Sequence, residues 1–142
     1  MKKTLFFVTM TVLICLCFSA CADRKGADSL WETAVYTEDT ELGEGAKTIE
    51  FEVEAENRKV TFTIHTDKSN LGEALMEHHL ASGEKGPYGL YVKAINGMTA
   101  DYTKNKTYWE FFKGEEGLST GVDGEEINHG DKYMAKHNTS QQ

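Results

Sequence analysis

Two neighbouring segments of strictly alternating apolar and polar residues constrain the fold of this chain more than any other feature. Over residues 49–54, Ile, Phe and Val alternate with three Glu, and over residues 60–65, Val, Phe and Ile alternate with two Thr and a His. A period of two is typical of half-buried β-strands, because it places one residue type on each face. The short polar segment 55–59 is of hairpin length, which predicts antiparallel pairing with the Glu row facing water.

The following segments predict one helix and further strands. Asn70 and Glu73 have the spacing of a helix cap and its reciprocal acid, and apolar residues recur at helical intervals up to Leu80. We expect the helix to end at Ser82-Gly83. Asn96-Gly97 marks a tight hairpin, and the expected strands lie at residues 88–95, 98–102, 107–112 and around 131–135. The predicted fold class is α+β: one small domain with an antiparallel hairpin, one covering helix and a β-meander.

The first 21 residues have the layout of a secretory signal. Two Lys precede a run of 16 residues without a charge, from Leu5 to Ala20, and a membrane-spanning helix needs about 20. The end of this run, Phe18-Ser19-Ala20-Cys21, resembles the lipobox of bacterial lipoproteins, which implies cleavage before Cys21 and lipidation of that residue. The alternative is an uncleaved anchor or an ordinary signal peptide. Either interpretation places the domain outside the cytoplasm, and the first anchors it to the outer side of the cell membrane.

We therefore expect four parts in the chain. They are a lipoprotein signal peptide, the lipidated cysteine with an acidic tether, the folded domain and a polar tail, over residues 1–20, 21–46, 47–137 and 138–142. The tether is predicted because residues 22–45 hold seven acids and two bases and show no sustained hydrophobic period. Three apolar residues in it leave docking on the domain or on a partner open: Trp31, Val35 and Tyr36.

Charge and cysteine content argue against several classes of function. The chain has 23 Asp and Glu against 15 Lys and Arg, a net charge of -8, so it is expected to repel nucleic acid. All three cysteines lie in the first 21 residues, which leaves the domain without a disulfide framework or Cys metal ligands. The five histidines lack the spacing of a metal site, and we interpret them as exposed or half-buried: His65, His78, His79, His129 and His137.

No arrangement of residues in the sequence is typical of catalysis. The chain has no GxSxG motif. The carboxylate pairs Glu115-Glu116 and Glu125-Glu126 lie in glycine-rich polar loops, where solvated charge is the ordinary explanation. We therefore expect no enzymatic activity, no cofactor and no metal.

Two aromatic segments, 88–92 and 108–112, are the most informative candidates for a binding surface. Strand alternation places Trp109 and Phe111 on one face and Tyr108 and Phe112 on the other. Some aromatic surface is therefore expected to be exposed. The alternative is a sheet that is covered on both faces and buries all of these rings.

These segments carry a resemblance to a known family. The sequences YGLYVKAING at 88–97, KTYWEF at 106–111 and GVD at 121–123, in this order, resemble the C-terminal domain of transcobalamin and gastric intrinsic factor. They also resemble the bacterial lipoprotein domains of unknown function grouped with it. The resemblance covers about residues 47–133. It implies an α+β, β-grasp-like module that in the vitamin carriers closes over one side of cobalamin.

The resemblance also implies which residues contact a ligand. A corrin is a broad, mostly neutral disc fringed with amides, so it suits a flat aromatic or aliphatic platform and a closely approaching main chain. We expect Trp109 and Tyr88 to provide the platform, and Gly89 and Gly114 to allow the approach. The candidate ligand-binding residues are Tyr88, Gly89, Leu90, Tyr91, Val92, Trp109, Glu110, Phe111, Gly114 and Leu118.

Two hypotheses of function stay open. The first is a membrane-anchored extracytoplasmic module that captures a corrinoid or a similar flat molecule, and it predicts that Trp109 is partly exposed beside the loop 113–121. The second is a non-enzymatic cell-surface module that meets another envelope protein through a strand edge or the acidic tether. A fully buried Trp109 and no groove near Tyr88 would favour the second hypothesis.

Overall fold

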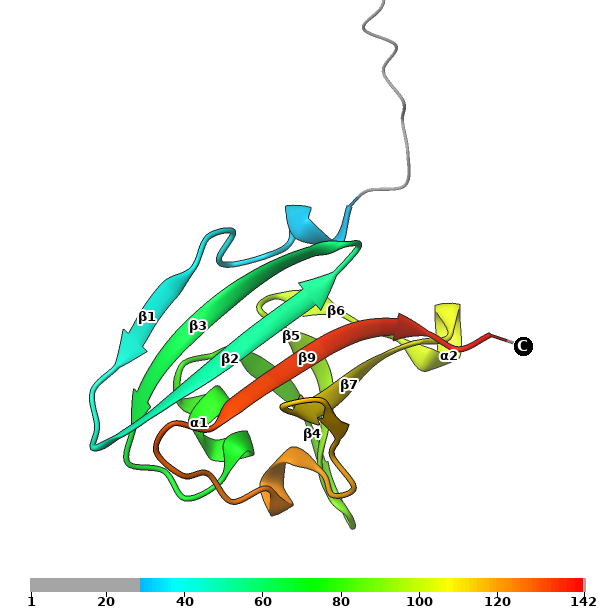
Figure 1. The fold of residues 1–142 in the computed structure, drawn as a ribbon. Coiled ribbons are helices and arrows are strands. Elements are labelled where there is room, and N and C mark those ends of the chain that lie inside the picture. Colours follow the sequence, from blue (N-terminus) through cyan, green and yellow to red (C-terminus); the bar gives the residue numbers. More distant parts are fainter. Residues whose placement is uncertain (1–28, 142) are drawn as a thin grey trace, which may run out of the picture.

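The computed structural model describes residues 29–141, so the predictions for the signal peptide and Cys21 lie outside the described residues. It contains a six-stranded sheet in the order β1-β3-β2-β9-β7-β8 and a three-stranded sheet in the order β4-β5-β6 (Figure 1). This confirms the predicted α+β class. The elements are η1 (Leu30–Glu32), β1 (Thr40–Gly43), β2 (Lys47–Ala55), β3 (Arg58–Thr66), α1 (Leu71–Glu77), β4 (Ala81–Gly86), β5 (Gly89–Ile95), β6 (Met98–Thr99), α2 (Tyr102–Asn105), β7 (Thr107–Lys113), β8 (Glu116–Gly117), η2 (Val122–Gly124) and β9 (Lys132–Thr139).

The predicted hairpin is present and is the longest ladder of the large sheet. β2 and β3 pair antiparallel from Lys47 opposite Thr66 to Ala55 opposite Arg58. Glu56 and Asn57 connect them, with φ angles of 52° and 61°. Two residues with positive φ form the tight turn whose twist matches that of the strands. The connection is therefore shorter than the predicted segment 55–59, because both strands continue to the turn.

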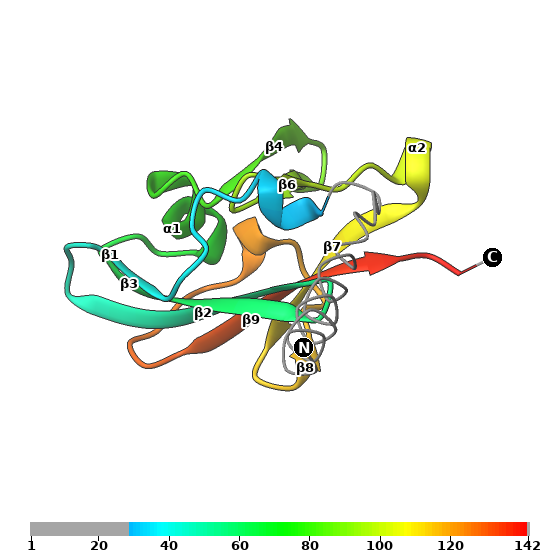
Figure 2. The same ribbon diagram turned by 90° about the horizontal axis from the view of Figure 1, so that it is seen from above.

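The two faces of the large sheet differ in what covers them. The inward side chains of β2 and β3 are buried with those of α1 in one core, and Figure 2 shows α1, β4 and β6 on the same side of this sheet. The outer face carries cross-strand ion pairs, such as Lys132–Glu50 at 3.0 Å and Lys136–Glu54 at 2.9 Å. The predicted Glu row therefore lies on the face that the helices leave uncovered, where charges remain hydrated.

The last strand does not complete a meander, in contrast to the prediction. β9 lies between β2 and β7, parallel to β2 and antiparallel to β7. It also runs to Thr139, beyond the predicted domain end at 137 and into the predicted tail. Alternation within a segment indicates a strand but carries no information on its neighbours, which are chosen by long-range packing.

Residues 29–46 pack on the domain, so the tether prediction is wrong for this part of the chain. Trp31 is buried, and its Nε1 donates a hydrogen bond to the Ala55 carbonyl at 2.9 Å. The main chain of Tyr36 exchanges two hydrogen bonds with the Asn96 side chain, at 2.9 and 2.8 Å. Of the two docking alternatives, the structure has the one on the domain itself.

The same arm continues into the large sheet. β1 pairs parallel with β3, and Glu41 Oε1 lies 2.7 Å from His65 Nε2. Val35 stays exposed. The segment folds without a hydrophobic period because its main chain pairs with β3, and the charge of Glu41 on this edge strand discourages pairing with other chains.

The predicted helix cap is correct, but the helix is shorter than predicted. Asn70 Oδ1 accepts a hydrogen bond from the Glu73 N–H at 2.9 Å. α1 ends at Glu77, and His79 has a positive φ of 55°, which stops a helix. The expected end at Ser82-Gly83 is instead the beginning of β4, a strand that the sequence did not indicate. No helix among the described residues is long and apolar enough to span a membrane.

Candidate functional site

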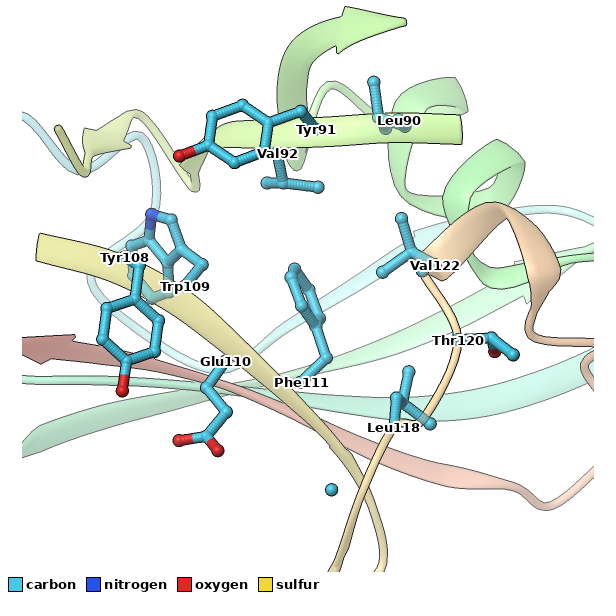
Figure 3. Close-up of a pocket in the computed structure, with 12 residues that line it drawn as sticks. Leu90, Tyr91, Val92, Tyr108, Trp109, Glu110, Phe111, Leu118, Thr120 and Val122 are labelled. Atoms are coloured by element: carbon cyan, nitrogen blue, oxygen red, sulfur yellow. The ribbon is translucent and has the colours of Figure 1, made fainter. Parts of the chain in front are cut away.

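A hollow of about 310 Å³ lies between β5, β7 and the loop 117–122 (Figure 3). In Figure 3 the side chains of Phe111, Val92 and Val122 point into one space, whereas Tyr108 and Glu110 turn away from it. We call it the first hollow, and its lining is Leu90, Tyr91, Val92, Tyr108, Trp109, Glu110, Phe111, Gly117, Leu118, Thr120, Gly121 and Val122. Because side chains alternate along a strand, consecutive lining residues mean that the main chain itself forms part of the wall.

Both strands that border the first hollow have an edge without a complete strand partner among the residues 29–141. β7 pairs with β9 along its whole length but with β8 only at Phe112 and Lys113. β5 pairs with β4 along its length but with β6 only at Ala94 and Ile95. The Phe111 carbonyl already accepts from the Leu118 N–H at 2.8 Å, and the Leu90 N–H donates to Asp123 Oδ2 at 3.1 Å. The remaining main-chain groups of these edges can serve a ligand that carries amides.

The structure brings most of the predicted ligand-binding residues together. Seven of them line the first hollow: Leu90, Tyr91, Val92, Trp109, Glu110, Phe111 and Leu118. Three do not, namely Tyr88, Gly89 and Gly114. Tyr88 is 98% exposed and lies in the turn between the end of β4 and the beginning of β5. Gly114 has a φ of 60° in the turn between β7 and β8, so local geometry already explains a glycine there.

Trp109 forms a wall of the hollow and is not an exposed platform. Its side chain is 7% exposed and meets the ring of His137 edge-on, with 5.2 Å between the ring centroids. This burial contradicts the exposure that the first hypothesis predicted, although a hollow exists beside the ring. Burial also lowers the pKa of His137, which favours an uncharged imidazole behind the wall.

The carboxylate of Glu110 faces the other side of β7. Glu110 Oε2 accepts a hydrogen bond from Asn138 Nδ2 at 2.5 Å, across the pair that β7 forms with β9. Glu110 therefore borders the first hollow through its main chain. Since it is the one charged residue in the lining, the wall that a ligand meets is neutral.

Asp123, which sequence reasoning did not select as a site residue, fixes the wall of the hollow. Its Oδ2 accepts a hydrogen bond from the Leu90 N–H at 3.1 Å, which ties the loop to β5. A Cβ at position 72 would collide with Oδ1 of the same carboxylate, so the first turn of α1 needs its glycine. The sequence signal was the GVD segment at 121–123, which contains the residue without indicating its contacts.

Potential metal ligands do not gather in the described part of the chain. Within residues 29–141, no three His, Cys, Asp or Glu side chains are close enough together to hold a metal ion. His65, for example, is engaged by Thr48 Oγ1 at 3.0 Å and by Glu41 at 2.7 Å. These contacts connect β1, β2 and β3.

The fold of this chain is shared with solved structures. The chain is similar to haptocorrin, whose structure was solved in complex with Cbi, with a TM-score of 0.55 and 18% identity. The match covers 70% of this chain and 27% of the haptocorrin chain. Haptocorrin belongs to the transcobalamin family, so the fold predicted from the resemblance is confirmed.

A second solved structure and a family model identify the family of this chain. A "putative metal binding protein" from Ruminococcus gnavus ATCC 29149 is 30% identical, with a TM-score of 0.64, and the match covers 68% of this chain and 100% of that one. Residues 69–136 match the domain of unknown function DUF4430, and the chain belongs to this family. Among curated proteins there is no match.

Proposed function

We propose that this protein is a non-enzymatic binding module that captures a corrinoid or a similarly flat small molecule. We further propose that Cys21 anchors it to the outer side of the cell membrane. The observation that carries the binding proposal is the first hollow, where apolar side chains and two open strand edges border one space. The fold shared with haptocorrin, a protein solved with Cbi, supports the same ligand class.

The lining suits an amide-fringed disc. Phe111, Val92 and Leu118 offer apolar surface to the flat face of such a ligand. The open edges of β5 and β7 offer main-chain donors and acceptors to peripheral amides. Among the described residues that line the space, Glu110 is the charged one and its carboxylate turns away, which agrees with a ligand whose rim is neutral.

The size of the hollow limits how much of a corrinoid it can enclose. At about 310 Å³ it lies near the lower end of small-molecule sites, which span roughly 300 to 1,000 Å³. A corrin ring is wider than this, so its outer part would rest on the rim, next to Tyr91. One face of the ligand stays open to solvent, and we expect weaker binding than in a site that covers both faces.

The test is calorimetric titration of residues 22–142 with cobinamide and with cobalamin. Phe111→Ala removes a ring that points into the hollow. Phe112→Ala removes a phenyl ring that strand alternation places on the opposite face of β7. We expect saturable binding that weakens about tenfold in Phe111→Ala, equivalent to roughly 1.4 kcal/mol, and stays unchanged in Phe112→Ala. Circular dichroism controls for folding. No heat with either corrinoid at millimolar concentration would remove this function.

The anchor has its own test, in cells that process lipoproteins. Cys21→Ser removes the thiol that a lipid would modify, so the protein should move from the membrane fraction to the soluble extracytoplasmic fraction. Ala22→Ser is the matched control and should stay with the membrane. Equal membrane association of both variants would reject the lipid anchor.

A second candidate function is recognition of an extended peptide of an envelope protein. The specific observation in its favour is the open edge of β7 over residues 107–110, to which a strand can add. An alternating Thr-Val peptide of about six residues, the usual strand length, is the probe. Chemical-shift changes at the Trp109 and Phe111 amides would support it, and none at millimolar peptide would reject it.

A further inference from the structure

A second hollow, of about 320 Å³, shares Tyr91 with the first. It lies between β5, the end of β6 and the beginning of α2. Its lining is Tyr91, Lys93, Thr99, Ala100, Asp101, Tyr102, Thr103 and Lys104. Neither the resemblance nor the comparisons assign a role to this hollow, and apart from Tyr91 none of its residues borders the first one.

Two exposed tyrosines stand in the second hollow. The exposed fractions of Tyr91 and Tyr102 are 56% and 48%. Tyr102 is nevertheless held in place, because Lys106 Nζ lies 5.1 Å from its ring centroid and Tyr108 meets it edge-on at 6.5 Å. About half of the Tyr102 surface nevertheless stays exposed, so part of the ring can meet a ligand. A fixed aromatic ring in solvent loses little conformational entropy when it binds.

The polar groups of the second hollow are hydroxyls and balanced charges. Asp101 Oδ1 caps α2 by accepting from the Thr103 and Lys104 N–H groups, each at 3.0 Å, and its Oδ2 lies 3.8 Å from Lys104 Nζ. Lys93 is paired with Glu84 at 2.6 Å. Each lysine therefore has an acidic partner. The Thr99 and Thr103 hydroxyls and the tyrosine hydroxyls add neutral donors and acceptors.

This combination matches one ligand chemistry better than others. A simple anion would meet the Asp101 carboxylate, and a fully apolar ligand would leave the threonine and tyrosine hydroxyls without partners. A pyranose ring has an apolar face of C–H groups for an aromatic ring and a rim of hydroxyls for Asp and Thr. The volume suits one such ring with room for water or a linked unit.

We propose that the second hollow binds a neutral pyranose, with the sugar ring against Tyr102 and its hydroxyls toward Asp101 and Thr103. This site does not depend on a corrinoid in the first hollow. The test is an NMR titration of ¹⁵N-labelled residues 22–142 with glucose, galactose, mannose and N-acetylglucosamine. We expect at least one of these sugars to shift the Thr103 and Lys104 amides saturably, with a dissociation constant on the order of 1 mM.

Two tyrosine variants separate this site from non-specific contact. Tyr102→Ala should weaken the binding at least tenfold, whereas Tyr88→Ala removes an exposed tyrosine that lines neither hollow and should leave it unchanged. Unchanged amide shifts in β2 show that both variants are folded. The proposal is overturned if none of the four sugars shifts these amides, if Tyr102→Ala binds as the parent does, or if the shifts cluster at Leu118 instead.

Discussion

β2 and β7 lie on either side of β9 in the same sheet, and they differ in how completely their edges are paired. β2 has β3 on one edge and β9 on the other, and its inward side chains lie in the core. β7 has β9 on one edge but only a two-residue partner on the other, and Phe111 stays half-buried beside the first hollow. A fully paired strand contributes stability, whereas an incompletely paired one leaves main chain and aromatic surface for a ligand.

The largest difference should appear when one phenylalanine of each strand is truncated. Phe51→Ala in β2 empties a site that is 0% exposed, so we expect a loss of about 3–5 kcal/mol in the free energy of unfolding. Phe111 in β7 faces a hollow, so we expect Phe111→Ala to cause roughly half that loss or less. Urea denaturation measures both. Equal losses would mean that the β7 region is core and not a site.

The next effect concerns the end of β7, where its edge is closed. Lys113 Nζ lies 2.8 Å from Asp131 Oδ2 and 3.0 Å from Glu125 Oε1, and Tyr133 OH donates to the same cluster. Hydrogen bonds to Asp131 and Glu125 raise the pKa of Lys113, and burial raises that of Tyr133. Lys113→Met leaves two facing carboxylates, so we expect a loss of about 1–2 kcal/mol at pH 7.

The pH dependence of this cluster follows from the directions of the shifts. Burial opposes ionisation of Asp131, but hydrogen bonds from Lys113, Asn128 and Tyr133 outweigh it and lower its pKa. Its contribution is therefore present above about pH 4 and lost on acidification. Because the pKa values of Lys113 and Tyr133 are raised, their protonated forms contribute to the free energy of unfolding below about pH 10. This contribution is lost as the pH rises further. Thermal unfolding from pH 3 to 11 should show both losses, and a flat profile would contradict the assigned contacts.

A smaller effect is expected at the loop that holds β5. Asp123→Ala removes the acceptor of the Leu90 N–H, which should cost about 1 kcal/mol and speed hydrogen exchange of that amide. Asp123→Asn keeps an acceptor oxygen and is the matched control. If exchange at Leu90 is unchanged in the alanine variant, this hydrogen bond does not set the width of the first hollow.

The smallest effect on stability is expected for an ion pair on the outer face of β2 and β9. Lys136→Ala breaks an ion pair with Glu54 at 2.9 Å between partly exposed side chains. Such pairs contribute little because water and salt screen them, so we expect less than about 0.5 kcal/mol. Denaturation at low and at high salt measures it. A loss above 1 kcal/mol would show that this face is covered by something in solution.

The sequence predicted the secondary structure correctly where a local pattern was sufficient. The β2–β3 hairpin follows from alternation, and Asn70 caps α1 through a contact only three residues away. It failed at β4, where Ser, Gly, Glu and Lys give no period, and at residues 29–46, where acidic composition concealed buried Trp31. β4 is a strand because it pairs with its chain neighbour β5, whereas the arm is held by β3 and by the Ala55 carbonyl far along the chain. In both cases pairing overrides weak local preference.

The sequence by itself determined the β2–β3 hairpin, the aromatic segments in β5 and β7 and the resemblance that they carry, because these depend on residue type and spacing. The tertiary structure alone decided the insertion of β9 beside β2, the burial of Trp109, the outward turn of Glu110 and the role of Asp123. Each of these depends on which distant segments become neighbours. That choice is made by the packing of the whole core, which no short stretch of sequence encodes.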